Sequence, residues 1–197
     1  MAAGLPPTCQ TALKEWASVL LAMERGEQCV LIRKGGLIEP GRGFDVLAKT
    51  AVFYPTFEHQ TVNFLREPYR GYLDAARARR PDDQHVRFEL CGQVVASAPH
   101  TDAAAIERLQ PFHVYNGAFA TQRLKWQPEQ PLVIAVVRAF RLPVPCVVPV
   151  DSRYAGCKSW VDLGEAVSLE GATPVLSDDA FLERVTAIRT LLSWPQG

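Results

Sequence analysis

The sequence predicts an α+β protein built on a mostly antiparallel β-sheet, strongly curved or partly closed, with helices from both termini flanking it. Three observations indicate this fold class. Apolar runs rich in β-branched residues recur along the chain, Pro- and Gly-rich turns separate them, and amphipathic segments with helix caps lie near both ends. With 197 residues, 48% of them hydrophobic, the chain can form one buried core, so we expect a single domain over residues 1–197.

The first element that the sequence predicts is an amphipathic helix. Thr8 follows two prolines and can cap it, and Gly26 can end it. Apolar residues between these limits have the i, i+3, i+4, i+7 spacing of one helix face, at Leu13, Trp16, Ala17 and Leu20.

Residues 28–57 predict a long β-hairpin, because two extended runs flank a Pro- and Gly-rich turn at residues 40–43. Gly35 and Gly36 break or bulge the first run. The following residues 63–84 are polar and predict a mobile connection with some helix, basic from Arg77 to Arg80 and closed by Pro81.

The second half of the chain predicts more strands and two helices. Residues 85–97 alternate as a strand does, and residues 101–109 have helical periodicity after a Thr101 or Asp102 cap. The apolar, β-branched residues 132–142 predict a central strand, and residues 146–163 predict two short strands around a loop. A closing helix begins after Ser177, with acidic residues in its first turn.

The charge balance and the cysteine content limit which functional classes the sequence supports. Basic and acidic residues number 21 each, so a nucleic acid or an anionic surface would have to be bound by a local patch. The five cysteines are odd in number and lack the paired spacing of a zinc site, which favours reduced thiols. No leader pattern and no apolar run of about 20 residues is present. We therefore expect a cytoplasmic protein that does not enter a membrane.

The stretch YPTFEHQ, residues 54–60, follows an apolar run and is the first candidate site. At the rim of a sheet, Glu58 and His59 are candidate catalytic residues, as base, acid or metal ligand, with Gln60 as an orienting amide. Asp45 with Glu58 and Gln60 is also similar to the acidic set of metal-dependent nucleases, in which carboxylates hold Mg²⁺. The alternative is a turn in which these side chains satisfy backbone groups.

A second candidate is the RKGG block. Arg33 and Lys34 end a strand, and Gly35 and Gly36 allow backbone N–H groups to approach a phosphate or carboxylate closely. The block lacks the arrangement of a P-loop. The alternative is a glycine bulge with solvated charges.

The third candidate is DSRYAGCKSW, residues 151–160. Cys157 next to Lys158 could be a reactive thiolate with His59 or His113 as its base, or a small buried apolar residue. Alternatively the loop stacks on bases and pairs with phosphates. Further residues of suitable type for such a surface are Arg153, Tyr154, Trp160, Trp126, Tyr115, Arg123, Lys125 and the cluster from Arg77 to Arg80.

Five blocks carry a family resemblance. The segments ALKEWA, RKGG followed by Glu39, YPTFEHQ, RLKW with RAFRL, and YAGCKSWVDL occur in this order. Together they resemble the bacterial DUF1802 family. The resemblance implies one domain over most of the chain and implies no activity, substrate or cofactor. In addition, W-x-P-x-x-P before an apolar strand is similar to the small β-barrels of the PUA-like RNA-binding group.

Three functional hypotheses follow, with the cofactor left open. The leading one is a nucleic-acid-binding module whose partner is single-stranded nucleic acid or another anionic ligand. Its pocket would be formed by Arg33, Lys34, Gly35, Gly36, His59, Gln60, Tyr154, Lys158 and Trp160. The alternatives are a metal-dependent phosphodiesterase or nuclease that uses Asp45, Glu58 and His59, and a non-enzymatic protein-interaction domain.

Overall fold

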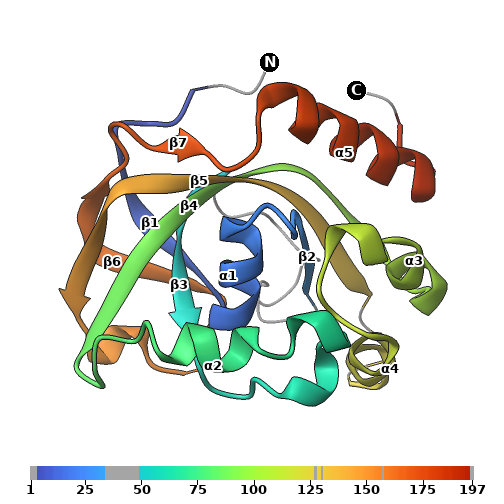
Figure 1. Ribbon diagram of the computed structural model, residues 1–197, viewed down its shortest axis with the longest axis horizontal. Coiled ribbons are helices and arrows are strands. Elements are labelled where there is room, and N and C mark those ends of the chain that lie inside the picture. The colour runs from blue at the N-terminus through green and yellow to red at the C-terminus, as the bar shows by residue number, and fades with distance from the viewer. Residues whose placement is uncertain (1–3, 34–48, 127, 130, 157, 196–197) are drawn as a thin grey trace.

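The computed structural model describes residues 4–33, 49–126, 128–129, 131–156 and 158–195. One sheet of seven strands organises this part of the chain (Figure 1). The strands are β1 (Thr8–Trp16), β2 (Val30–Arg33), β3 (Thr50–Thr56), β4 (His85–His100), β5 (Leu132–Pro149), β6 (Trp160–Ser168) and β7 (Thr173–Pro174). The α-helices are α1 (Ala17–Glu24), α2 (Tyr72–Arg77), α3 (Ala103–Arg108), α4 (Gly117–Lys125) and α5 (Asp178–Leu191).

The sheet is mixed but mostly antiparallel, as predicted. Its order is β2-β5-β4-β3-β1-β6, with β7 paired to β5. Among the described strands only β1 and β3 run parallel. Two register shifts in the long β4–β5 ladder mark bulges, which bend strands. The edge strands β2 and β6 do not pair with each other, so the sheet is open and the PUA-like barrel is not supported.

The first predicted helix is half wrong. Residues Thr8–Trp16 form β1, and only Ala17–Glu24 form α1. Because β3 and β6 take both edges of β1, these non-local pairings satisfy its backbone and override the local helical periodicity. Gly26, at φ 73°, follows the end of α1 as predicted.

The predicted hairpin over residues 28–57 is also wrong. Its two strands, β2 and β3, both exist, but β2 pairs with β5, and β3 pairs with β1 and β4. Two strands, β5 and β4, separate them in the sheet. The apolar β5 offers β2 an edge that leaves three of its four residues buried. The expected turn at residues 40–43 and the expected bulge at Gly35 and Gly36 lie outside the described residues.

The later elements match the sequence prediction more closely. Asp102 caps α3 through the Ala104 N–H, and Ser177 caps α5 through the Ala180 N–H. The central strand extends to Pro149, because residues expected to form a separate strand continue β5. Helix α4, which was not predicted, begins after Asn116, whose side chain accepts from the Ala118 and Phe119 N–H groups.

Both faces of the sheet are buried. The larger apolar cluster contains α1 and joins it to residues such as Phe53, Ile134 and Phe119. The smaller cluster, on the other face, includes Val52 and Phe88. All residues from Ala17 to Met23 are buried, so α1 is enclosed on every side, as an evenly apolar helix must be. Figure 1 shows α1 in the middle of the molecule with α2 beside it.

The connection over residues 63–84 follows the start of the short helical turn Val62–Phe64 and contains the turn Glu67–Tyr69 and α2. It is packed on the core through Leu65, Leu73 and Ala76, which are buried. The helix expected here is therefore confirmed.

Replacement of Gly92 by Ala tests the packing between the sheet and its interior. A Cβ atom at Gly92 would lie 2.6 Å from the Phe53 ring and 2.8 Å from a Val137 methyl group, both in the core. We expect the variant to lose about 1–3 kcal/mol of unfolding free energy, measured by urea denaturation. Gly71→Ala is the matched control, because nothing lies within 4 Å of its Cβ position and its φ is −64°. Equal stability of the two variants would contradict this packing.

Candidate functional site

The polar residues of YPTFEHQ form a corner that caps the central helix. The Gln60 side-chain oxygen accepts hydrogen bonds from the Ser18 N–H at 3.1 Å and the Ser18 hydroxyl at 2.9 Å. It thereby satisfies a free donor in the first turn of α1, where Trp16 supplies no side-chain cap. Glu58 and His59 are exposed in the turn, and His59 has a φ of 58°. The structure thus gives Gln60 a helix-capping contact.

Arg33 is engaged in a largely buried ion pair. Its Nη1 lies 3.2 Å from a carboxylate oxygen of Glu15, and its Nη2 donates to the carbonyl of Lys14. The Glu15 side chain is only 3% exposed. The pair connects the end of β2 to β1, four places away in the strand order. The other predicted residues of this block, Lys34, Gly35 and Gly36, lie outside the described residues, as do Asp45 and Cys157.

The third block is partly buried as well. The Tyr154 hydroxyl donates to the Leu163 carbonyl at 3.0 Å, and its ring is buried in the smaller apolar cluster. Trp160 is half-buried against the larger cluster, whereas Lys158 is exposed. Tyr154 and Trp160 therefore belong to different faces of the sheet.

The wider aromatic and basic set suggested for single-strand binding is also divided. Tyr115 is buried and stacks on Phe119 with ring centroids 3.8 Å apart. Arg123 lies over the Phe119 ring, 5.1 Å from its centroid. Trp126 is exposed at the end of α4. These side chains do not form one platform.

His113 is buried with both ring nitrogens engaged. Its Nε2 lies 2.9 Å from the Ile106 carbonyl, and its Nδ1 lies 3.2 Å from the Tyr115 backbone nitrogen. These partners require a neutral ring that donates from Nε2 and accepts at Nδ1. Burial lowers the pKa of His113 to about 4. This geometry makes His113 a structural residue of the core.

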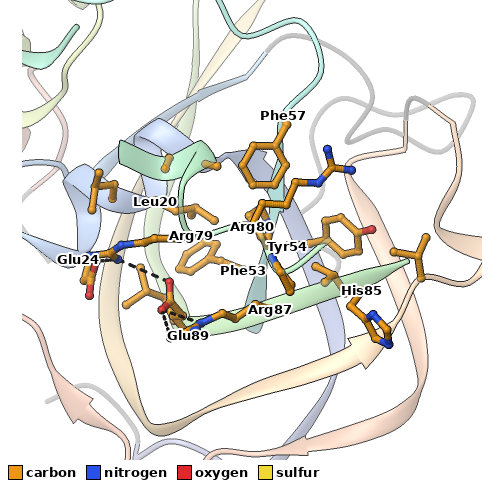
Figure 2. A pocket seen from close by; sticks show the side chains of 18 residues that line it. Leu20, Glu24, Phe53, Tyr54, Phe57, Arg79, Arg80, His85, Arg87 and Glu89 are labelled. Atoms are coloured by element: carbon orange, nitrogen blue, oxygen red, sulfur yellow. Dashed lines mark hydrogen bonds and ion pairs between the residues drawn. The ribbon is translucent and has the colours of Figure 1, made fainter. Parts of the chain in front are cut away.

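The structure reveals a pocket where β3 and β4 separate. Their ladder runs from Thr50 to Val52 on β3 and stops there, although both strands continue. The resulting cavity of about 100 Å³ is open to solvent on one side, and α1 and α2 complete its walls. We call it the Arg80 pocket, with a floor formed by Leu20, Leu21, Phe53, Ala76, Val86 and Leu90 (Figure 2).

The rim of the Arg80 pocket carries charge. On one side Arg79 bridges Glu24 and Glu89, and Arg87 contacts Glu89 at 2.9 Å (Figure 2). On the other side lies Arg80, which also lines the pocket. Arginines therefore flank the opening, and carboxylates of Glu24 and Glu89 hold two of them.

Arg80 is placed by aromatic residues of the YPTFEHQ stretch. Its guanidinium lies 5.2 Å from the centroid of the Phe57 ring, and Figure 2 shows its side chain between Phe57 and Tyr54. The nearest carboxylate that pairs with it is that of Asp83, at 2.8 Å. Burial raises the pKa of Tyr54, so its phenol stays neutral at physiological pH. This stretch thus contributes to a pocket through its aromatic residues, Tyr54 and Phe57.

The sequence shows a basic cluster from Arg77 to Arg80 but does not indicate that members of it line a pocket. One local indication is present: Pro81 prevents the helical segment from continuing, and Arg80 therefore lies in the connection between α2, which ends at Arg77, and β4, which begins at His85. The partners Tyr54 and Arg87 come from strands whose separation depends on distant pairings, and no local pattern predicts that.

In the part of the chain that the structure describes, no group of three or more His, Cys, Asp or Glu side chains could hold a metal ion. Within the same residues, none of the helices combines the length and apolar character needed to cross a bilayer.

Fold and pocket together define a class: an α+β protein with an open, curved sheet around a central helix and an amphipathic pocket beside that helix. The family model described as "Domain of unknown function (DUF1802)" matches residues 12–187. The chain therefore belongs to the DUF1802 family, as the five sequence blocks predicted. No curated protein and no solved structure matched it.

Replacing Arg33 by Met distinguishes a structural from a ligand-binding role. The variant leaves the buried Glu15 carboxylate without its partner, which we expect to cost about 3–5 kcal/mol of unfolding free energy. Arg77→Ala removes an exposed pair with Asp74 and should cost less than about 1 kcal/mol. Combining Arg33→Met with Glu15→Leu should recover much of the loss. Wild-type stability of Arg33→Met in urea denaturation would refute a structural role for the ion pair.

The buried His113 predicts a loss of stability in mild acid. Its pKa is about 4 in the folded protein against 6.5 in the unfolded chain, so protonation favours unfolding. The stabilisation is complete above pH 6.5 and declines by about 3 kcal/mol as the pH falls towards 4. Urea denaturation at several pH values measures this decline, and NMR titration assigns it. An NMR pKa near 6.5 for His113 would contradict the expectation.

Proposed function

We propose that this protein binds a small organic anion in the Arg80 pocket. The observation that carries the proposal is the combination of an apolar floor with an arginine-lined opening in one cavity. Ligand pockets typically combine apolar walls with a few placed polar groups that fix orientation. Arginine matches carboxylate and phosphate groups because its planar guanidinium can donate two parallel hydrogen bonds.

Arg80 is the best anchor for the anionic group. Its side chain is 43% exposed, and its partner Asp83 is 81% exposed, so their ion pair contributes little and can be exchanged for a ligand at small cost. Arg79, in contrast, is shared between Glu24 and Glu89. Contact with Phe57 limits the freedom of the Arg80 side chain before a ligand arrives.

Nucleic-acid binding stays a prediction, and it can be tested at the same pocket. Tyr54 and Phe57 next to Arg80 are suitable for one stacked base and one phosphate. A long polyanion, however, would also meet the carboxylates of Glu24 and Glu89 at the rim and that of Asp83 beside Arg80. A single anionic group can reach Arg80 without approaching all of them, and for this reason we favour a small ligand.

Arg80→Ala tests the proposal, with Arg77→Ala as a matched control. Both arginines belong to exposed i, i+3 ion pairs near the end of α2, but only Arg80 lines the pocket. The probe is the fluorescent aromatic sulfonate 8-anilinonaphthalene-1-sulfonate. We expect Arg80→Ala to weaken its binding about tenfold or more through loss of a charge-assisted contact, and Arg77→Ala to bind as wild type does.

Melting curves of both variants establish that they are folded. Fluorescence anisotropy with labelled single-stranded DNA and RNA at two salt concentrations belongs to the same experiment. Salt-sensitive binding that depends on Arg80 would favour the nucleic-acid hypothesis. Equal probe affinity of the two arginine variants, or no binding of any anionic probe, would refute the proposed site.

A further inference from the structure

Building on the proposed anion site, we infer that the body of the ligand is a hydrocarbon, so that the Arg80 pocket takes an alkyl monocarboxylate. The floor of this pocket is entirely apolar. Its six side chains come from α1, α2, β3 and β4, and none of them carries a polar atom: Leu20, Leu21, Phe53, Ala76, Val86 and Leu90. All six are buried in the protein, so they form a fixed apolar surface against which a ligand can pack.

The charged side chains of the pocket lie at its rim, where solvent reaches them. The ionic side chains of the pocket, Glu24, Arg79, Arg80, Arg87 and Glu89, all carry solvent-exposed area. A carboxylate placed beside Arg80 therefore keeps contact with water, while the chain attached to it can extend over the floor. This arrangement separates a charged end from an apolar end, as an amphiphilic ligand does.

A ligand with a polar body fits the floor poorly. A nucleotide whose base entered the floor, instead of stacking outside it on Tyr54 or Phe57, would place ring nitrogens and exocyclic groups against apolar side chains that offer no hydrogen-bond partner. Each polar group buried without a partner costs about 1–3 kcal/mol. A hydrocarbon chain meets no such penalty and gains from burial instead.

The inference is tested by calorimetric titration of the wild-type protein with hexanoate, octanoate and decanoate. We expect the affinity to rise about fourfold for each added methylene group until the cavity is filled. Octanamide, which has the same body without the charge, should bind at least about tenfold more weakly than octanoate, because it loses the ionic contact with Arg80. Arg80→Ala should remove this difference, and Arg77→Ala should preserve it.

A second variant examines the floor directly. Ala76 is 4% exposed and lines the pocket from α2, so Ala76→Leu adds volume inside the cavity. The variant should weaken decanoate binding more than hexanoate binding, which shortens the preferred chain. A melting curve close to that of wild type shows that α2 remains packed. If Ala76→Leu weakened the binding of hexanoate and of decanoate by the same factor, the inference would be overturned.

The outcomes separate this inference from the proposal on which it rests. Adenosine monophosphate that binds in an Arg80-dependent manner, while the alkyl carboxylates do not bind, would overturn the hydrocarbon inference and keep the anion site. Failure of both ligand classes would overturn both. If the affinity rose with chain length but neither Arg80→Ala nor Ala76→Leu changed it, the carboxylates would be adsorbing elsewhere on the protein, and the inference would be overturned. Binding of the alkyl carboxylates that both substitutions alter supports the inference.

Discussion

Helix α1 imposes the main constraint on this structure, because it is apolar on every side and must be covered on every side. Residues from Ala17 to Met23 are all buried, so no face of the helix can meet solvent. A flat sheet covers one face of a helix. Bulges in the β4–β5 ladder and strands that pass on both sides of α1 in Figure 1 let one sheet cover more than one face. Helix α2 packs on a further side.

Two polar contacts complete this enclosure. Gln60 supplies the hydrogen bond that the first turn of α1 would otherwise lack, and it does so from the corner after β3. The Arg33–Glu15 pair joins β2 to β1 through side chains, where no backbone ladder connects them. Burying a charged pair is costly, but losing one partner is more costly still, so the pair acts mainly as a specific link between two distant strands. The sheet is open in its hydrogen bonding, yet bridged at this point.

Local signals explain which parts of the fold the sequence could predict. The starts of α3 and α5 are predictable because Asp102 and Ser177 cap the helices that they precede. Strand β4 is predictable because the alternation of its apolar and polar residues is a local pattern. Helical spacing misassigned β1, since Leu13 and Trp16 belong to a strand and Ala17 and Leu20 to a helix. The pairing of β2 with β5 depends on residues a hundred positions away, and sequence periodicity does not encode it.

Distant partners also explain why Arg33 and Gln60 resemble ligand-binding residues in the sequence. Their polar character is evident there, but their partners Glu15 and Ser18 are not.

The pocket follows from the same enclosure. In the sheet that bends around α1, β3 and β4 are not paired along their full length, and their ladder ends at Val52 and Cys91. Beyond that point, the side chains of Leu20 and Leu21 on α1 are left with a cavity beside them. Protein interiors are otherwise close-packed, so a cavity with apolar walls forgoes contacts that a larger side chain at Ala17 or Ala76 could supply. A bound hydrocarbon chain would restore those contacts, and Arg80 stands where the attached charge can remain in water. The geometry that covers the central helix therefore also leaves a cavity whose apolar floor and charged rim match the two ends of an amphiphilic anion.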